Sequence, residues 1–321
     1  MIVVTGAAGF IGSVLIGTLN CKGINELIIS DDFERPDKRA NLAGKRWIEK
    51  IDRLHLLNAI KERADKIEFF FHIGARTDTT ETDLDLLNTL NLNYSKQVWE
   101  FCSHYQIPLV YASSAATYGM GEHGYDDDHQ VVAKLQPLND YGRSKNDFDI
   151  WVLSQTSAPP FWAGMKFFNV YGPNEYHKGR MASVVFHAFN QIMETGQVNL
   201  FRSHKPDFQD GGQKRDFIYV KDVVDVLLFM MHRRPVSGLY NLGTGISRSF
   251  IHLARSVFHA ANKTENICFV DTPTDIREKY QYFTEANVWK LRNAGYEKPF
   301  FTLEAGITDY VTNYLLEKAN L

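Results

Sequence analysis

Short apolar runs alternate with amphipathic stretches along the first half of the chain. The apolar runs predict buried strands at Ile2–Thr5, Glu26–Ser30, Glu68–His72, Pro108–Ala112 and Phe161–Phe168. The stretches between them carry apolar residues at helical spacing and predict helices at Phe10–Cys21, Asp52–Asp65, Asp83–Tyr105 and Tyr141–Gln155. Strands and helices that alternate in this way build a parallel sheet, so the predicted fold class is α/β with a doubly wound parallel sheet.

The pattern changes after Tyr171-Gly172-Pro173, where the loops become longer and the alternation less regular. Two later runs, Asp216–Val220 and Gly238–Leu242, still have the character of sheet strands. We therefore predict a nucleotide-binding domain over residues 1–170 that also takes in the later strands near residues 216–245. Residues 171–321 are expected to form largely a smaller, mostly helical substrate lobe.

Composition narrows the class of protein. The 321 residues carry 35 Lys and Arg against 38 Asp and Glu, and this net charge of −3 offers no basic surface for nucleic acid or for an anionic membrane. Three widely spaced cysteines do not suggest a disulfide framework, and the 11 histidines form no His-Glu-x-x-His motif, so no metal site is expected. Val223–Met231 is too short to span a membrane, and Ile2–Val4 has no basic segment before it. We expect no signal peptide and a cytoplasmic location.

A glycine motif directly follows the first predicted strand and opens the first predicted helix. Gly6 allows a tight turn, Gly9 lets the backbone approach a pyrophosphate, and Gly12 lets the helix pack closely on the sheet. The phosphates then meet the free N–H groups and the positive dipole end at the helix N-terminus. The motif predicts a Rossmann-type dinucleotide site.

Acidic and basic side chains follow the second predicted strand. Asp31 comes about 20 residues after the glycines, where a carboxylate suits a ribose hydroxyl and favours NAD. Asp32 would repel a 2′-phosphate, whereas Lys38 and Arg53 are cations that could hold one. The residues alone therefore leave the choice between NAD and NADP open.

Tyr141 and Lys145 lie four positions apart and so share one face of a predicted helix. An ammonium beside a phenol stabilises the phenolate, so we expect the pKa of Tyr141 to be lowered and the tyrosine to act as a general base. Ser114 follows a buried strand, which places its hydroxyl at the carboxyl edge of the sheet, where ligands bind. The ordered set of glycine turn, Ser114, Tyr141 and Lys145 predicts a redox active site.

These motifs resemble the extended short-chain dehydrogenase/reductase superfamily, which holds nucleotide-sugar epimerases and dehydratases, and the resemblance covers essentially the whole chain. In the dehydratases an acidic residue follows the catalytic hydroxyl and helps to expel water. Here Ala115 and Ala116 occupy that place. The resemblance therefore implies epimerisation.

A narrower resemblance, to the heptose 6-epimerases of that superfamily, rests on motifs in both halves of the chain. These motifs are Tyr111–Gly119, Phe168–Ser183, Lys214–Phe217, Asn241–Gly245, Tyr280–Thr284 and Ala294–Phe300. The resemblance implies an NADP-linked inversion at C6 of ADP-D-glycero-D-manno-heptose through a transient ketone, in the pathway that feeds the lipopolysaccharide core. It implies two acid/base groups, Tyr141 and Lys178, and a homo-oligomer, often a pentamer.

The same resemblance, carried over residue by residue, implies further side chains that bind the cofactor and the nucleotide-sugar substrate. With the glycines of the turn, the cofactor positions are Gly6, Gly9, Phe10, Ile11, Gly12, Asp31, Asp32, Lys38, Arg53, Gly74, Ala75, Asn91, Lys145, Val170 and Lys178. The substrate positions are Asn169, Arg180, His187, Phe201, Arg202, Ser203, His204, Arg215 and Tyr280. Physically, a guanidinium such as that of Arg215 can clamp a diphosphate, and Phe201 or Tyr280 could stack on adenine.

The chain also departs from the heptose 6-epimerases. Asp32 stands where they usually have Asn, and Arg180 replaces a small residue after Lys178-Gly179. Arg76-Thr77-Asp78 is not their commonest sequence on the cofactor side. Departures beside the substrate are compatible with a substrate whose sugar side chain differs from that of the heptose.

Two other functions remain open at this point. Another nucleotide-sugar 4-epimerase or reductase of the same superfamily would not need Lys178 as a second base. A non-catalytic module that senses nucleotides would not need Tyr141 or Lys145, and both residues are present. A serine hydrolase is disfavoured because the chain has no Gly-x-Ser-x-Gly motif.

Overall fold

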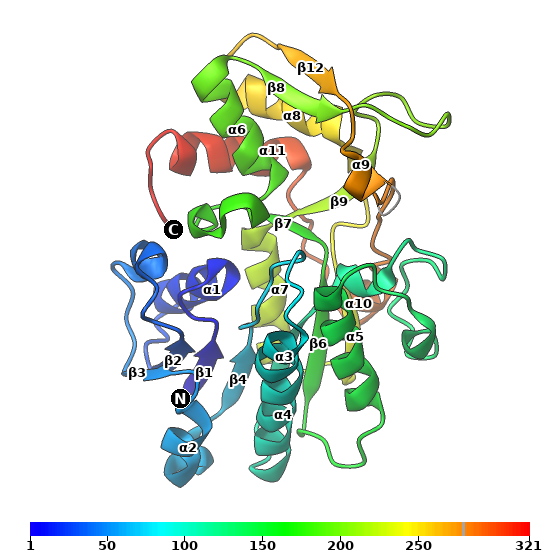
Figure 1. The fold of residues 1–321 in the computed structure, drawn as a ribbon. Coiled ribbons are helices and arrows are strands. Elements are labelled where there is room, and N and C mark those ends of the chain that lie inside the picture. The colour runs from blue at the N-terminus through cyan, green and yellow to red at the C-terminus, as the bar shows by residue number, and fades with distance from the viewer. Residues whose placement is uncertain (278–279) are drawn as a thin grey trace.

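A seven-stranded sheet forms the centre of the computed structural model, which describes residues 1–277 and 280–321 (Figure 1). Its strands are β1 (Ile2–Thr5), β2 (Leu27–Asp31), β3 (Glu49–Asp52), β4 (Phe69–His72), β5 (Leu109–Ser114), β6 (Trp162–Phe167) and β10 (Gly238–Leu242). They lie in the order β10-β6-β5-β4-β1-β2-β3, and each pair of neighbours is parallel. The predicted Rossmann-type α/β class is confirmed.

Alternate residues of the strands build two apolar layers, one on each face of the sheet. Val4 faces the layer that contains α1 (Phe10–Cys21) and α7 (Val220–Arg233). Val3 faces the layer that contains α2 (Leu56–Ile60), α4 (Tyr94–His104) and α5 (Asp140–Leu153). Because both faces are covered, the strands are apolar at nearly every position.

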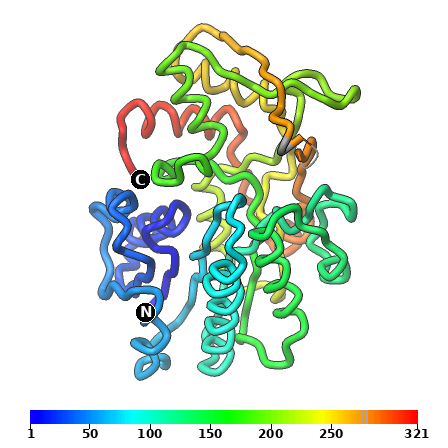
Figure 2. Tube along the Cα trace, viewed as in Figure 1, coloured from blue at the N-terminus to red at the C-terminus, as the bar shows by residue number. Residues whose placement is uncertain are grey.

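The second half of the chain adds a smaller part at one end of the sheet. Its strands form two small sheets, β11 (Ser247–Ser249), β9 (Lys214–Tyr219) and β7 (Asn169–Tyr171) in one, and β12 (Ile267–Val270) and β8 (Val198–Phe201) in the other. Its helices are α6 (Val184–Thr195), α8 (Phe250–Ala260), α9 (Thr274–Arg277) and α11 (Leu303–Tyr310), whereas α10 (Trp289–Asn293) packs on β10 of the central sheet. Figure 2 shows the last segment returning beside the first part of the chain, where Leu321 N donates to Asn174 Oδ1 at 2.9 Å.

Several expected elements differ in detail. Glu49–Asp52 forms β3 at a sheet edge, and the helix expected over Asp52–Asp65 is reduced to α2 and a following 3₁₀ turn. The stretch expected to be one helix over Asp83–Tyr105 is helical, with a π turn over Asn88–Asn93 between α3 (Leu84–Leu87) and α4. Of the two later strands, β10 joins the central sheet and β9 lies in a small one. The domain boundary at residue 170 stays a prediction.

The outer edge of the central sheet is covered by side chains of a loop. β10 is one of the two edge strands, and its Leu239 N–H donates to His129 Nε2 at 3.1 Å. Two residues further on, the Asn241 N–H donates to Asp127 Oδ2 at 2.8 Å, and Asp127 is buried. Burial raises the pKa of Asp127, while the bond from Asn241 opposes that shift.

Candidate active site

The glycine turn leaves no room for side chains. A β-carbon on Gly6, whose φ is +66°, would lie 2.6 Å from the backbone N and Cα of Gly74. A β-carbon on Gly12 would lie 2.1 Å from the Gly6 carbonyl oxygen. The turn therefore packs backbone against backbone and presents the first N–H groups of α1 at the carboxyl edge of the sheet, as a pyrophosphate requires.

The two acidic residues at the end of β2, Asp31 and Asp32, both have cationic partners. Asp31 accepts the Ala8 N–H on Oδ2 at 2.9 Å, and its Oδ1 lies 2.9 Å from Lys38 Nζ. The Asp31 carboxylate thus ties the glycine turn to the basic segment. Asp32 Oδ2 lies 3.5 Å from Arg53 Nη2. Two carboxylates and two cations of the predicted cofactor set are therefore grouped beside the turn.

Ser114 and Tyr141 meet between the end of β5 and the start of α5. The Asn139 side chain accepts the Gly142 N–H at 2.8 Å and so caps α5 one turn before Lys145. The Tyr141 and Ser114 side chains lie beside each other. Lys145 Nζ donates to the Ala112 carbonyl at 2.9 Å. The three residues expected for the redox site are thus brought together.

The electrostatics of this group differ from expectation in one respect. Burial raises the pKa of Tyr141, and the hydrogen bond with Ser114 opposes that rise, so the expected lowering by Lys145 is wrong for this structure. The physical reason is the burial of the phenol, while the Lys145 ammonium donates to a backbone carbonyl. Burial in turn lowers the pKa of Lys145 to about 8, against the opposing charge of Asp149. His72, buried nearby, has a pKa lowered to about 3 by burial and then by the Lys145 charge.

Lys178 approaches the glycine turn from the second half of the chain. It lies in a 3₁₀ turn over Tyr176–Met181, and its Nζ is 5.4 Å from the centre of the Phe10 ring at the start of α1. Glu175 supports this turn from within the protein by accepting the Ser183 N–H and hydroxyl at 2.5 and 2.7 Å. Burial lowers the pKa of Lys178, and Glu175 opposes the shift. A lysine with a lowered pKa can act as a base.

Four of the predicted substrate residues form a cluster of rings and one guanidinium. The Arg215 guanidinium is 5.7 Å from the centre of the Tyr280 ring, and the Tyr280 and Phe201 ring centres are 5.8 Å apart. Tyr282 connects His204 to this cluster: its ring centre is 5.7 Å from that of Tyr280, and its hydroxyl lies 2.8 Å from His204 Nδ1. Burial lowers the pKa of Arg215. In this cluster, a cation that can bind a diphosphate lies beside flat rings that can stack on a nucleotide base such as adenine.

Other predicted residues lie at separate places. Arg202 faces solvent and pairs with Asp271 at 3.1 Å, and the Ser203 N–H donates to Asp210. Arg180 and His187 lie together, since His187 Nε2 is 3.3 Å from the Arg180 carbonyl oxygen. Asn169 is exposed on β7, and the remaining positions of the predicted cofactor set are Ile11, Gly74, Ala75 and Val170, at the carboxyl edge of the sheet or on β7. Substrate contact by these residues stays a prediction.

Asn91 lies within the π turn, an irregularity that often marks a functional site. Its Oδ1 accepts the Arg76 N–H at 2.8 Å, and its Nδ2 donates to the Arg76 carbonyl and to Ser144 Oγ. Asn91 therefore joins the loop after β4 to the helix that carries Tyr141.

Sequence reasoning missed a buried network beneath Ser114. Lys166 and Asp149 form an ion pair at 2.9 Å, and both side chains are fully buried. Asp149 also accepts from the Ser113 hydroxyl at 2.6 Å, and Lys166 donates to Thr117 Oγ1 at 2.8 Å. A lysine in the middle of an apolar strand and an aspartate four positions after Lys145 were the signals that could have found it.

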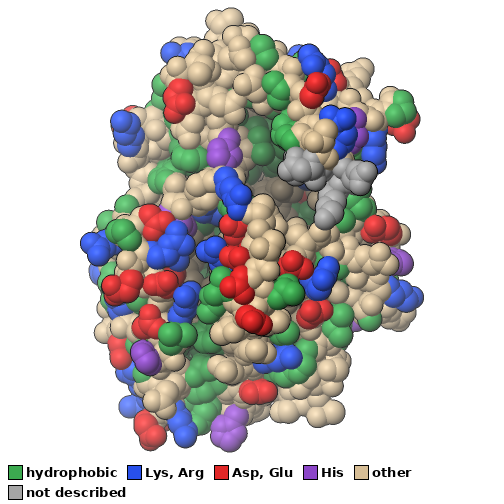
Figure 3. Space-filling view, viewed as in Figure 1, with side chains coloured by type: hydrophobic (Ala, Val, Ile, Leu, Met, Phe, Trp, Pro, Cys, Tyr) green, Lys and Arg blue, Asp and Glu red, His purple; other side chains and the backbone are tan. Residues whose placement is uncertain are grey.

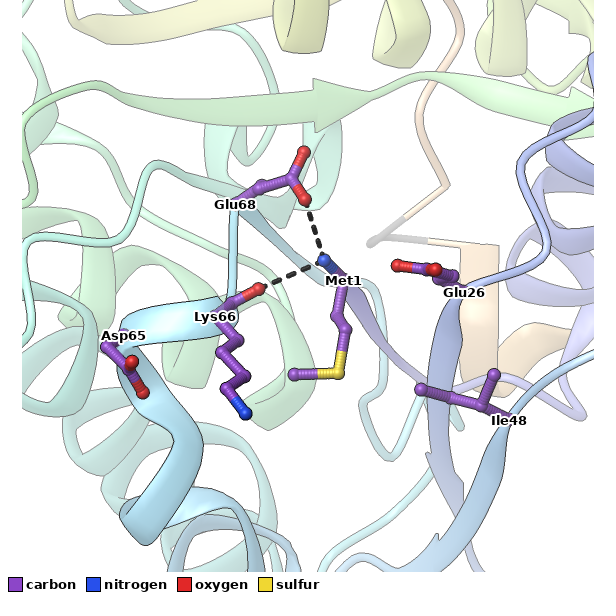
Figure 4. A pocket seen from close by; sticks show the side chains of 6 residues that line it. All are labelled: Met1, Glu26, Ile48, Asp65, Lys66 and Glu68. Carbon is purple, nitrogen blue, oxygen red and sulfur yellow. Dashed lines mark hydrogen bonds and ion pairs between the residues drawn. The ribbon is translucent and has the colours of Figure 1, made fainter.

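A depression at the opposite end of the sheet does not fit a dinucleotide. Figure 4 shows Met1 at its centre, with the terminal ammonium donating to the Lys66 carbonyl and to Glu68. It lies at the amino ends of the strands, whereas ligands of open parallel sheets bind at the carboxyl ends. In contrast, Figure 3 shows the surface hollowed between the sheet domain and the smaller part of the molecule.

The residues that the structure describes hold no group of three or more His, Cys, Asp or Glu side chains suited to a metal ion. Within the same residues, every helix is too short or too polar to cross a membrane.

The sheet order, the glycine turn and the grouped Ser114, Tyr141 and Lys145 define a dinucleotide-dependent protein of the extended short-chain dehydrogenase/reductase type. The family described as NAD dependent epimerase/dehydratase matches residues 2–243. The chain belongs to this family and, within it, to the ADP-L-glycero-D-manno-heptose-6-epimerases, as the relatives below show. Membership assigns it a nicotinamide dinucleotide cofactor.

Three relatives illustrate the similarity. The ADP-L-glycero-D-manno-heptose-6-epimerase of Fusobacterium nucleatum is 49% identical, over 99% of each chain. The enzyme of the same name from Nitratidesulfovibrio vulgaris is 43% identical, over 98% of each chain. The crystal structure of the enzyme of that name from Helicobacter pylori superposes with a TM-score of 0.80 at 28% identity, covering 97% of this chain and 95% of the other.

Proposed function

We propose that this protein inverts C6 of ADP-D-glycero-D-manno-heptose to give the L-glycero epimer. The observation that carries the proposal is Lys178, which supplies a second acid/base candidate 5.4 Å from the Phe10 ring, while Tyr141 lies beside Ser114 at the same edge of the sheet. The 49% identity to an enzyme named for this reaction supports the same choice of substrate.

Inversion at a secondary alcohol needs a proton transfer on each face of the intermediate ketone. Bound nicotinamide supplies hydride transfer at C6. One of the two residues, Tyr141 or Lys178, accepts the proton of the O6 hydroxyl as the ketone forms. After the ketone has turned in the site, the other residue gives a proton to O6. No net oxidation results, and the protons balance because one residue gains the proton that the other loses.

Each residue has a surrounding that suits this role. Burial lowers the pKa of Lys178, which favours the neutral form that can accept a proton. Ser114 lies beside Tyr141, and its hydroxyl would orient the phenol hydroxyl. Arg215, Tyr280 and Phe201 would hold the ADP group, so that the sugar extends towards the acid/base pair.

NADP is the cofactor we propose. The support is the pair of cations, Lys38 and Arg53, that stand at 2.9 and 3.5 Å from the Asp31 and Asp32 carboxylates and can turn to a 2′-phosphate. NAD is the alternative, in which the two carboxylates would accept the ribose hydroxyls. To distinguish NADP from NAD, the purified protein can be denatured and the mass of the released dinucleotide measured by mass spectrometry.

Proton NMR of the purified protein with ADP-D-glycero-D-manno-heptose tests the reaction. Without added cofactor, we expect conversion to a mixture of the two C6 epimers, because the cofactor is regenerated in each turnover. Absence of conversion after addition of both NAD and NADP would contradict the proposed substrate.

We propose further that the protein is a homo-oligomer located in the cytoplasm, and that its number of subunits is five. The support is the family resemblance and an apolar groove beside α6, bordered by the partly exposed Met193 and Leu316. Light scattering of the purified protein would give the mass of the assembly, which is expected to be five times that of the chain.

A further inference from the structure

Arg180 joins two segments that are about a hundred residues apart in the sequence. Its Nη2 lies 3.2 Å from both carboxylate oxygens of Asp78 and also contacts the Thr80 hydroxyl. Asp78 and Thr80 belong to the loop that follows β4, on the cofactor side of the site. We call these contacts the Arg180 bridge. Both ends of the bridge are departures that the sequence shows from the heptose 6-epimerases.

Neighbouring contacts support the bridge on both sides. Thr79 Oγ1 lies 3.8 Å from Met181 Sδ, so the residue after Arg180 meets the same loop. His187, on α6, lies 3.3 Å from the Arg180 carbonyl and fixes its backbone. The hydrogen bonds from Thr80, and then the Arg180 charge, hold the pKa of Asp78 below its usual value, so the carboxylate stays ionised at neutral pH.

The loop that carries Asp78 is itself anchored to the catalytic helix. Arg76 pairs with Glu81 at 2.9 Å, which closes the loop on itself. Asn91 bonds to both the N–H and the carbonyl of Arg76, and it donates to Ser144 Oγ, three residues after Tyr141. A continuous series of contacts thus runs from α5 through Asn91 and the loop to Arg180.

The turn between Lys178 and Arg180 has little support of its own. Gly179 has φ +52°, is exposed, and would carry a β-carbon with no other atom within 4 Å. The neighbouring backbone is held at one end by Glu175 and at the other by the Ser183 cap of α6. Between these ends, His177 Nδ1 lies 3.2 Å from Asn41 Nδ2, and Arg180 adds the ion pair that holds the turn to the loop after β4.

We propose that Arg180 and Asp78 are positioning residues, whose bridge fixes the Lys178 turn relative to the helix that carries Tyr141. The inference rests on the function proposed above, in which these two groups act on opposite faces of one ketone. Two acid/base groups on separate segments need a fixed separation, and the bridge connects those segments at the surface, two residues from Lys178. It acts on the placement of Lys178 and makes no contact with the reacting atoms.

Charge reversal tests the bridge without disturbing the core, because Arg180 is 66% exposed. We would prepare Asp78→Arg, Arg180→Asp and the double variant that restores the pair with opposite polarity. A matched control is the exposed pair of Arg255 and Glu265, 3.2 Å apart on and after α8. Its reversed variants, Arg255→Asp and Glu265→Arg, change the same charges far from the site. The readouts are kcat, KM and hydrogen–deuterium exchange of residues 176–182.

Each single reversal should lower kcat about three- to tenfold with less change in KM, and should speed exchange across residues 176–182. The double variant should recover most of kcat and of the protection, and the Arg255 and Glu265 controls should resemble the wild type. Loss with Arg180→Asp alone, no loss with Asp78→Arg and no recovery in the double variant would instead show direct substrate contact by Arg180 and overturn the proposal. So would unchanged kcat and exchange in both single variants. An inactive wild type would instead contradict the proposed function. That result differs from both results that would overturn the role of the bridge.

Discussion

The carboxylate of Asp149 and the ammonium of Lys166 lie 2.9 Å apart, and neither side chain is exposed to solvent. Asp149 comes from the helix that carries Tyr141 and Lys145, and Lys166 comes from β6. Through Ser113 and Thr117, the pair reaches the turn that presents Ser114. The buried ion pair therefore joins α5 to β6, and its hydrogen bonds to Ser113 and Thr117 hold the residues on both sides of Ser114.

Removing one member of this pair should destabilise the fold strongly. Lys166→Met leaves the buried Asp149 charge without its partner, and we expect a loss of about 3–5 kcal/mol in the free energy of unfolding, measured by urea titration. Lys166→Arg keeps the charge and should lose less. Arg255→Met, which removes the cation of an exposed ion pair, should lower the free energy of unfolding by less than about 1 kcal/mol. Equal losses at the two sites would contradict the role given to the buried pair.

Tyr141→Phe should lower kcat about 10²- to 10⁴-fold with little change in KM, because it removes a proton transfer and keeps the ring. Steady-state kinetics with the ADP-heptose substrate would measure both constants. Near-normal turnover of the variant would remove Tyr141 from the acid/base role.

Lys178→Met should lower kcat by a similar factor if Lys178 is the second acid/base group. A lysine that only contacts a phosphate would instead raise KM and leave kcat nearly intact. Lys263→Met, at an exposed lysine remote from the site, is the matched control and should behave as the wild type.

The activity should fall on the alkaline side near pH 8. Burial lowers the pKa of Lys145 to about 8, so its ammonium loses a proton as the pH rises through that value. Profiles of kcat/KM between pH 6 and 10 would locate the decline. In Lys145→Arg the guanidinium stays protonated, and the decline should move upward. A decline at an unchanged pH in that variant would assign it to another group.

His72 makes the stability depend on pH in the acidic range. Its pKa is about 3 in the fold, against 6.5 for the free side chain, so the unfolded chain takes up the proton first as the pH falls. The stability that the neutral ring contributes is complete above about pH 6.5 and is lost towards pH 3, at about 1.4 kcal/mol per pH unit. Urea titrations at several pH values should show a shallower dependence for His72→Gln than for the wild type. His232→Gln, at an exposed histidine, should follow the wild type.

Much of the fold could be predicted because its signals are local. Ile2–Thr5 and Phe10–Cys21 have the bounds that their apolar pattern predicts, since the strand is buried throughout and the helix buries most of its residues. β3 was missed because the edge strand Glu49–Asp52 has mostly polar residues and only Ile51 buried. The π turn at Asn91 preserves a helical pattern, so periodicity could not reveal it.

In the candidate site, too, some features could be predicted from local sequence and others depend on the folded structure. Gly6 and Tyr141 belong to short motifs with a mechanism, and such motifs can be read from sequence. The Arg180–Asp78 contact joins positions far apart in the chain, and no local spacing encodes it. The rise in the pKa of Tyr141 depends on how deeply the phenol is buried, which the sequence alone does not specify.

The covered edge at β10 has a consequence for assembly. An edge strand with free N–H groups can accept another chain and continue the sheet from one molecule into the next. Here His129 and Asp127 accept the Leu239 and Asn241 N–H groups from within the same chain. Copies of this protein therefore cannot join by strand addition along β10 unless that loop first peels away, and the same loop protects the sheet from growing into aggregates at this edge.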